Sequence, residues 1–314
     1  RGAGDSKTPF KFLVLQVALD IVLNPLLIFG PGPLPALGIA GSALATLIAS
    51  ATSLAALVAH LYRRHHELCL RGPDLALLRV DRAILATLVR KGVPMGLQMI
   101  VVSGSAIVMI MLVNRFGTDT TAAYGAAWQL WNYVQLPAFA LGAAVSSMAA
   151  QNVGANRWDR VGRTAKVGVA LSMGMTAALV VPTVLLDRWM LGLFLAPGPA
   201  LDAAVHLHAI GSWSFVLFAV SMVLFGVVRS TGAVVPPLVA LFVALWVVRF
   251  PFAALLLPHW GADAIWWSFN LSAAVAAALS IGYYRWGGWR KARMGPGHGA
   301  GPGSTNGAAV EPAS

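Results

Sequence analysis

Long, uninterrupted apolar segments recur along the whole chain, and they constrain its fold more than any other feature. Each is about as long as the roughly 20 residues that an α-helix needs to cross a hydrocarbon core of about 30 Å. The segments lack the alternation of a barrel strand, and a helix satisfies its own backbone hydrogen bonds in lipid. The sequence therefore predicts an all-α, polytopic integral membrane protein with eight transmembrane helices, over approximately residues 12–30, 36–62, 92–114, 122–149, 167–186, 205–228, 233–257 and 263–284.

Charged residues are scarce and unevenly placed. Hydrophobic residues make up 58% of the chain and charged residues 11%, against about 25% charged in soluble domains, which excludes a soluble globular protein. All but three of the 22 lysines and arginines (Arg115, Arg188 and Arg249) lie before the first predicted helix or after an even-numbered one. Because positive loops stay in the cytoplasm, we expect a multi-pass protein of the cell (inner) membrane with both ends cytoplasmic. Topology accounts for the net charge of +11, and no nucleic-acid partner is expected.

Two predicted helical hairpins, one near each end of the chain, resemble each other. Each follows a polar turn in which a proline comes eight residues after an arginine, Arg1 and Pro9 in the first and Arg229 and Pro237 in the second. An even number of crossings separates the hairpins, so they point the same way, as in the parallel repeats of some secondary transporters. If the repeat is complete, four further helices precede Arg1, for twelve in total. Chance similarity between two helical hairpins is the alternative.

Five short stretches resemble, in order, sequences of the multidrug and toxin extrusion (MATE) family of efflux transporters. They are RGAGDSKTP at 1–9, NPLLIFG at 24–30, GIAGSALAT at 38–46, GVPMGLQ at 92–98 and QNVGANR at 151–157. The resemblance matches this chain to helices five to twelve of a twelve-helix, two-lobe transporter. It implies two lobes that face each other across a cleft, and export driven by inward flow of protons or sodium ions.

This resemblance and the composition together predict four regions. Residues 1–62 are expected to form the last two helices of the N-terminal lobe, and residues 63–91 a cytoplasmic linker that contains an amphipathic helix. Residues 92–286 are expected to form the six-helix C-terminal lobe. Residues 287–314 are rich in Gly, Pro and Ser and predict a disordered cytoplasmic tail.

One acidic residue, Asp20, lies deep inside a predicted span. An acid in that position costs about 2.5 to 3.5 kcal/mol on insertion scales and therefore marks a functional candidate. Gln16, Asp20 and Asn24 recur every fourth residue, so they share one helical face. Their oxygens are hard donors that suit a proton or Na⁺, and no other cofactor is expected. The alternative is that the three side chains only hold helices together by hydrogen bonds.

The resemblance narrows this site. Many relatives carry Asn and Asp four residues apart on the fifth helix, within a cation site. Here the order is reversed, with Asp20 in the Asn place and Asn24 in the Asp place. Thr46 or Ser42 on the next helix is expected to contribute a hydroxyl. Other relatives bind the cation through acids on the seventh and tenth helices, but the matching segments of this chain contain neither Asp nor Glu.

Polar and aromatic side chains inside other spans are candidates for lining the substrate cleft. Trp128, Asn132 and Gln135 share a face of the fourth predicted helix, and Gln98 lies in the third. Aromatic rings can hold a flat organic cation against their π faces. Helix packing and interfacial anchoring are the alternatives. Arg249 is unusual inside a span, and we expect it to extend toward the outer surface or to pair with an acid of the missing part.

No motif of hydrolytic, metal-dependent or ATP-driven chemistry occurs in the sequence, and with one cysteine, Cys69, neither an enzyme nor a metal site is expected. The prediction is a secondary antiporter that exports organic, mainly cationic compounds such as drugs and toxins, in exchange for protons or Na⁺. Its partners would be the small-molecule substrate and the lipid bilayer, and it would act as a monomer. One alternative is a flippase for lipid-linked oligosaccharides, which should carry more Lys and Arg in its spans to meet pyrophosphate. The other is a non-transporting membrane scaffold or truncated remnant.

Overall fold

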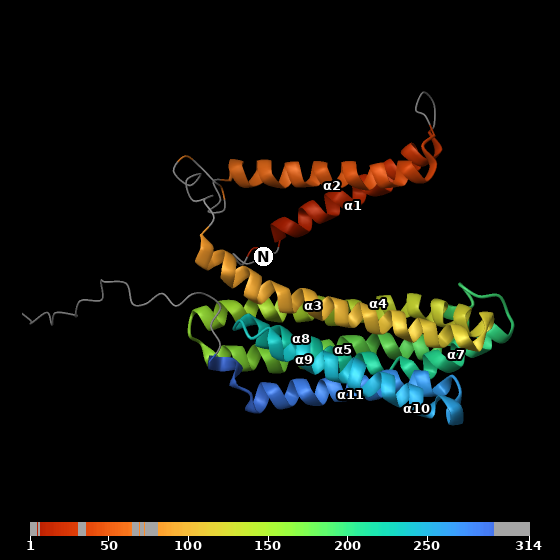
Figure 1. Ribbon diagram of the computed structural model, residues 1–314. Helices are drawn as coiled ribbons and strands as arrows, with labels where there is room; N and C mark the ends of the chain where they lie inside the picture. The colour runs from red at the N-terminus through yellow and green to blue at the C-terminus, as the bar shows by residue number, and fades with distance from the viewer. Residues whose placement is uncertain are drawn as a thin grey trace, which may run out of the picture. The chain divides into compact units, whose positions relative to one another are not determined.

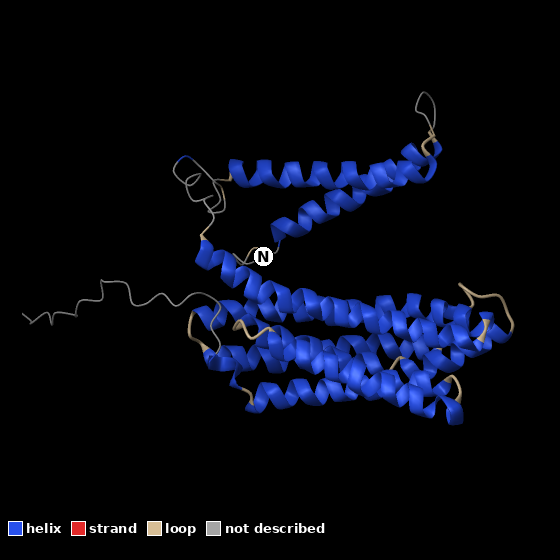
Figure 2. Ribbon diagram, viewed as in Figure 1, coloured by secondary structure: helices blue, strands red, loops and turns tan. Residues whose placement is uncertain are grey.

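A computed structural model describes residues 5, 7–30, 36–64, 69, 72 and 81–291, and Figures 1 and 2 show them as helices and connecting loops. No strand occurs in this part of the chain, which confirms the all-α prediction. Within it, seven helices are long and apolar enough to cross a membrane, and a bent helix pair brings the number to eight. The eight predicted spans are therefore present. The chain divides into two compact units, residues 1–80 and 81–314.

The first unit is a hairpin of α1 (Lys7–Phe29) and α2 (Gly38–Arg63), which lie side by side in Figure 1. A Cβ atom at Gly41 of α2 would overlap the backbone carbonyl of Leu27 on α1, so the two helices approach more closely there than any larger residue allows. Small residues permit such close approach between membrane helices. The buried positions of α2 are all of this kind: Gly41, Ala45, Ala49 and Ser53.

The second unit is a bundle of helices (Figure 1). Its elements are α3 (Arg82–Val113), η2 (Asn114–Phe116), α4 (Thr118–Gly154), α5 (Trp158–Leu185), α6 (Asp187–Leu191), α7 (Pro199–Gly211), α8 (Ser214–Ser230), α9 (Val235–Phe242), η3 (Val243–Arg249), α10 (Phe250–Trp260), α11 (Asp263–Trp286) and η4 (Gly288–Lys291). Helix α8 packs against α4, α5 and α11, and nearly all of its side chains are buried. A helix that is apolar all round is expected at the centre of such a bundle.

Glycines bring α4 and α8 close together at one point. A Cβ atom on Gly226 of α8 would lie 2.7 Å from the carbonyl oxygen of Gly142, and one on Gly142 of α4 would lie 3.2 Å from the carbonyl oxygen of Met222. Because the first distance is shorter than real Cβ contacts, the backbones can meet there only if residue 226 is glycine.

Helix α3 begins ten residues before the predicted start of the C-terminal lobe. The carboxylate of Asp81 accepts hydrogen bonds from the backbone N–H groups of Ala83 (2.7 Å) and Ile84 (3.3 Å), and this cap starts the helix at Arg82. The predicted boundary at residue 91 falls inside this continuous helix and is wrong. An aspartate directly before a helical pattern was the missed signal. Residues 65–68, 70–71 and 73–80 of the predicted linker lie outside the described residues.

The end of the chain also differs from the prediction in part. Residues 288–291 form a turn of 3₁₀ helix, η4, and the side chain of Trp289 is only 1% exposed. The first residues of the predicted disordered tail therefore pack on the bundle, because a large aromatic side chain there has an apolar site to fill. Residues 292–314 lie outside the described residues.

Two of the predicted spans are not simple α-helices. The sixth is the pair α7 and α8, bent by 45°, and the seventh contains the π-helical stretch η3 between α9 and α10.

The two hairpins of the predicted repeat share one backbone feature. Gly38, the first residue of α2, has a φ angle of +54°, and Gly261, shortly before α11, has a φ angle of +57°. Glycine adopts such left-handed conformations readily.

Candidate functional site

The carboxylate of Asp20 on α1 faces a hydroxyl on α2. Thr46 Oγ1 donates a hydrogen bond of 2.9 Å to Asp20 Oδ1, across 26 residues of sequence. The same hydroxyl lies 3.2 Å from the backbone carbonyl of Ser42, one turn earlier on its own helix. Asp20 is partly buried, and Thr46 is exposed. Of the two hydroxyls that the sequence offered for this contact, the structure selects that of Thr46.

Gln16 and Asn24, which share a helical face with Asp20, lie one turn before and one turn after it. Gln16 Nε2 donates to Ser50 Oγ on α2 at 3.0 Å. Asn24 Nδ2 donates to the backbone carbonyl of Asp20 at 3.1 Å. In both residues the amide nitrogen makes the hydrogen bond, which leaves the amide oxygen as a further acceptor. The structure therefore brings Gln16, Asp20, Asn24 and Thr46 together along one seam of the hairpin.

One more hydrogen bond joins α1 and α2, four residues before Gln16 on α1. Ser53 Oγ donates a 2.6 Å hydrogen bond to the backbone carbonyl of Phe12. Asp20 has no ion-pair partner among the described residues, since the two salt bridges found there join Arg188 to Asp202 and His206 to Asp263. Among the described residues, the carboxylate is thus contacted by one hydrogen bond, from Thr46.

Trp128 of α4 lies at the edge of a buried aromatic cluster. Its ring is 36% exposed, whereas the neighbouring rings of Tyr124, Trp131, Trp266 and Phe269 are nearly fully buried. The ring centroid of Trp128 lies 5.9 Å from that of Tyr124 and 6.5 Å from that of Trp131. Such neighbours fix the orientation of the Trp128 ring, and its exposed part is free to contact another molecule.

The remaining predicted cleft residues have different surroundings. Asn132 is exposed one turn after Trp128. Gln135 donates from Nε2 to the backbone carbonyl of Trp131, 3.1 Å away on its own helix. Gln98 of α3 is 7% exposed, and its Oε1 atom is buried without a hydrogen-bond partner in the part of the chain that the structure describes. Trp128 and Asn132 are thus both exposed on α4, whereas Gln98 is buried.

Arg249, at the end of the π-helical stretch η3, points to the neighbouring helix α11. Its Nε atom donates to Ser272 Oγ at 2.8 Å, and its Cζ atom lies 4.5 Å from the centroid of the Phe269 ring. Arg249 therefore contacts residues of α11 inside the second unit. One polar and one aromatic partner, both on α11, hold the guanidinium there.

The sequence reading missed a buried polar cluster in the second unit. Trp131 Nε1 lies within hydrogen-bond distance of His208 Nδ1 (3.1 Å) and Ser212 Oγ (3.0 Å), and all three side chains are fully buried. Ser212 Oγ also donates to the backbone carbonyl of His208 at 2.6 Å. Gly211 has no side chain, and a Cβ there would lie 2.7 Å from the Trp131 ring. The spacing of His208 and Ser212, four residues apart in an apolar segment, was the available signal.

Sequence comparison relates the chain to transport proteins. The MatE family model matches residues 94–255. The probable multidrug resistance protein YoeA of Bacillus subtilis (strain 168) is 37% identical over 296 residues, which cover 94% of this chain and 64% of YoeA. The probable multidrug resistance protein YpnP of the same strain is 31% identical over 295 residues, which cover 94% of this chain and 64% of YpnP. The chain thus spans slightly less than two thirds of the length of these curated relatives.

Structure comparison agrees with this relationship. A crystal structure of a MATE protein in complex with MaL6 has a TM-score of 0.81 to this chain, at 20% sequence identity, over 90% of this chain and 63% of that one. A crystal structure of the Vibrio cholerae MATE transporter VcmN in the bent form has a TM-score of 0.78 at 17% identity, over 90% and 63% of the two chains. At these identities the similarity shows the fold, which is that of a polytopic membrane protein.

Proposed function

The chain belongs to the MatE family, and from this membership we propose that it serves in a secondary active antiporter, which exports organic, mainly cationic compounds in exchange for protons or sodium ions. The relatives' names include multidrug resistance and transporter, so the chain is assigned to transport rather than to catalysis. We place it in the cell membrane with its ends on the cytoplasmic side, acting as a monomer. The lipid bilayer and a small organic substrate are its proposed partners.

The hydrogen bond between Thr46 and Asp20 carries this proposal. A carboxylate inside a membrane span is costly unless it is hydrogen-bonded, paired or protonated. The Thr46 hydroxyl stabilises the ionised form of Asp20 by donating to it. A proton or a sodium ion would neutralise the same charge, and the amide oxygens of Gln16 and Asn24 lie on the same face to supply further oxygen ligands. Asp20 is therefore the proposed coupling residue, with Gln16, Asn24 and Thr46 around it.

Coupling follows from a difference in affinity between two states. A cation drives a conformational change only to the extent that it binds one arrangement of the helices more tightly than the other. Neutralising Asp20 removes its need for the Thr46 hydroxyl, which changes a contact between α1 and α2. The hairpin would then favour one arrangement with the cation bound and another without it, and substrate release would accompany the first.

The substrate is proposed to contact the exposed part of the Trp128 ring. A planar cation gains about 0.5 to 2 kcal/mol over an aromatic face, depending on how far water is excluded. Asn132, exposed on the next turn of α4, and Gln135 beyond it could donate or accept hydrogen bonds to polar groups of the same molecule. Gln98, whose Oε1 atom has no hydrogen-bond partner among the described residues, is proposed as a further lining residue on α3.

Transport by the purified full-length protein in proteoliposomes tests the proposal. An inward-directed proton gradient and an inward-directed sodium gradient would be imposed in separate experiments, and movement of a fluorescent planar cation such as ethidium followed. We expect one gradient to drive transport by the wild type. Asp20→Asn, which keeps the shape of the side chain and removes its charge, should abolish gradient-driven transport.

Asp119→Asn is the matched control. Asp119 is an exposed acid in the first turn of α4, outside the hairpin, so its loss should leave transport unchanged. Thermal unfolding of each variant in detergent would show that folding is intact. Gradient-driven transport by Asp20→Asn at the wild-type rate would refute the role of Asp20, and absence of ethidium transport by the wild type under either gradient would refute export of organic cations.

A further inference from the structure

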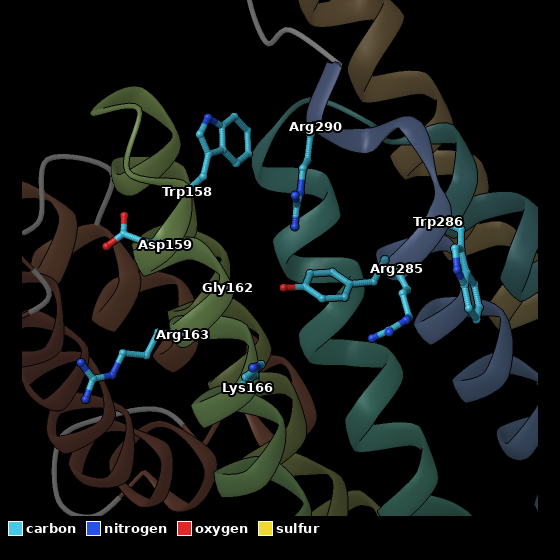
Figure 3. Close-up of a pocket in the computed structure, with 9 residues that line it drawn as sticks. Trp158, Asp159, Gly162, Arg163, Lys166, Arg285, Trp286 and Arg290 are labelled. Atoms are coloured by element: carbon cyan, nitrogen blue, oxygen red, sulfur yellow. The ribbon is translucent and has the colours of Figure 1, made fainter.

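A pocket of about 680 Å³ opens between the start of α5 and the end of α11, next to η4 (Figure 3). Four basic residues line it: Arg163, Lys166, Arg285 and Arg290. The one acidic residue of the lining is Asp159, and in Figure 3 both its carboxylate and the guanidinium of Arg163 point away from Arg285 and Arg290. The pocket therefore brings cations of α5 next to cations of α11 and η4, which follow α5 by more than 100 residues in sequence.

These cations are not neutralised by carboxylates in the described part of the chain. The two ion pairs found there lie elsewhere, at Arg188–Asp202 and His206–Asp263. Arg285 and Arg290 instead lie near aromatic rings, with Cζ atoms 5.9 Å from the Trp286 ring centroid and 5.3 Å from that of Trp289. Such contacts hold a guanidinium in place without removing its charge. The pocket consequently presents a concentrated positive potential to any anion that enters it.

The wall formed by η4 is anchored in the bundle. Trp289, 1% exposed, stacks on Tyr284 with 5.1 Å between ring centroids, and its Nε1 atom donates to the backbone carbonyl of Tyr284 at 2.7 Å. Thr231 Oγ1 donates to the backbone carbonyl of Trp289 at 2.9 Å. Arg290 follows this anchored residue directly, so the fold sets the position of its backbone.

The pocket lies at the ends of two apolar helices, the start of α5 and the end of α11. The basic loops that flank it are those that the positive-inside rule assigns to the cytoplasm. Trp158 and Trp286 line it as well, and Trp286 is 79% exposed. Exposed tryptophans at the ends of spans are typical of the headgroup level of a bilayer. Basic pockets between transmembrane helices on the cytoplasmic side suit anionic headgroups.

We propose that this pocket binds the phosphate headgroup of an anionic phospholipid of the cytoplasmic leaflet. Guanidinium groups form charge-assisted, two-pronged hydrogen bonds with phosphate oxygens, and a lysine adds a point charge. A soluble phosphate would share this chemistry. The lipid is favoured because the pocket sits at the end of two spans with an exposed tryptophan at its edge, where acyl chains can lie along the helices.

Lipid binding to the detergent-solubilised full-length protein tests the proposal. Phosphatidylglycerol and phosphatidylcholine with identical acyl chains would be titrated separately and bound lipid counted by native mass spectrometry. We expect tighter binding of phosphatidylglycerol. Lys166→Gln or Arg285→Gln should weaken that binding about fivefold, which corresponds to about 1 kcal/mol for each basic residue near an anionic headgroup. Arg160→Gln is the matched control, because Arg160 is an exposed cation on the same helix that does not line the pocket.

A second pair of variants tests the pocket without removing any of its basic side chains. A Cβ atom at Gly162, which lines the pocket, meets nothing within 4 Å, so larger residues fit there without a backbone clash. Gly162→Glu should weaken phosphatidylglycerol binding much more than Gly162→Gln, which has the same shape and no charge. Equal binding of the two lipids, or an equal effect of Lys166→Gln and Arg160→Gln, would overturn the proposal. Displacement of the lipid by an equal concentration of inorganic phosphate would overturn the lipid assignment.

Discussion

The hydroxyl of Thr46 donates a 2.9 Å hydrogen bond to the carboxylate of Asp20, and a second acceptor, the backbone carbonyl of Ser42, lies 3.2 Å from the same oxygen. One hydroxyl has one proton, so it can donate fully to only one of the two acceptors at a time. While Asp20 is ionised, the charged acceptor is favoured. Once a cation neutralises Asp20, the carbonyl of the hydroxyl's own helix becomes the better partner. We therefore expect the hydroxyl to change its acceptor with the charge of Asp20.

Removal of the Thr46 hydroxyl should impair gradient-driven transport. Thr46→Val keeps the shape of the side chain but leaves Asp20 without its donor, and a hydrogen bond to a charged group contributes about 1.5 to 3 kcal/mol. We expect the transport rate at a fixed gradient to fall about tenfold or more in proteoliposomes. Thr46→Ser retains the hydroxyl and should keep most of the activity. Equal rates for the valine and serine variants would show that the hydroxyl is not required.

Gly41→Ala should destabilise the protein. The added methyl would overlap the carbonyl oxygen of Leu27, and the helices α1 and α2 would have to move apart. Overpacking of this kind costs about 1 to 3 kcal/mol, so the midpoint of thermal unfolding in detergent should fall by several degrees. Gly96→Ala, in α3, is the control, since its Cβ meets nothing within 4 Å and alanine favours helix. An unchanged midpoint for Gly41→Ala would contradict the close approach of the hairpin.

Trp131→Phe should destabilise the second unit. The substitution keeps an aromatic ring but removes the N–H that lies between His208 and Ser212, so buried polar atoms lose a partner. We expect a loss of about 1 to 3 kcal/mol, measured as a lower midpoint of unfolding. Trp267→Phe is the comparison, because Trp267 on α11 is 49% exposed and should tolerate the change. A larger effect at residue 267 than at residue 131 would be inconsistent with the buried cluster.

Trp128→Ala should weaken binding of planar cationic substrates. The exposed part of the ring would be lost, and with it a cation–π contribution of about 0.5 to 2 kcal/mol. The half-saturating concentration of ethidium should therefore rise about fivefold, while Trp128→Phe, which keeps an aromatic face, should change it less. Trp213→Ala removes another exposed tryptophan, on the bend between α7 and α8, and should leave the affinity unchanged. The same effect from both alanine variants would argue for a general role of exposed rings.

The helices were predicted well from sequence, and their ends and distortions less well. Apolar length identifies a span whatever its neighbours are, because each segment must satisfy its own backbone in lipid. The bend between Gly211 and Ser214 and the π-helical stretch η3 depend on packing against other helices, for example on the Trp131 ring that Gly211 accommodates. The start of α3 at Arg82 depends on one capping side chain, Asp81, which is a weak signal beside a long apolar run.

The sequence by itself determined the spans, the single acid deep within one of them and the face that Asp20 shares with Gln16 and Asn24, because apolar length and helical periodicity are local properties. Only the tertiary structure decided which hydroxyl meets that acid and which tryptophan is buried. Thr46 reaches Asp20 across 26 residues, and Trp131 reaches His208 across 77. The basic pocket likewise joins α5 to α11 and η4. Such contacts are set by how the helices pack, and no local pattern in the sequence encodes that geometry.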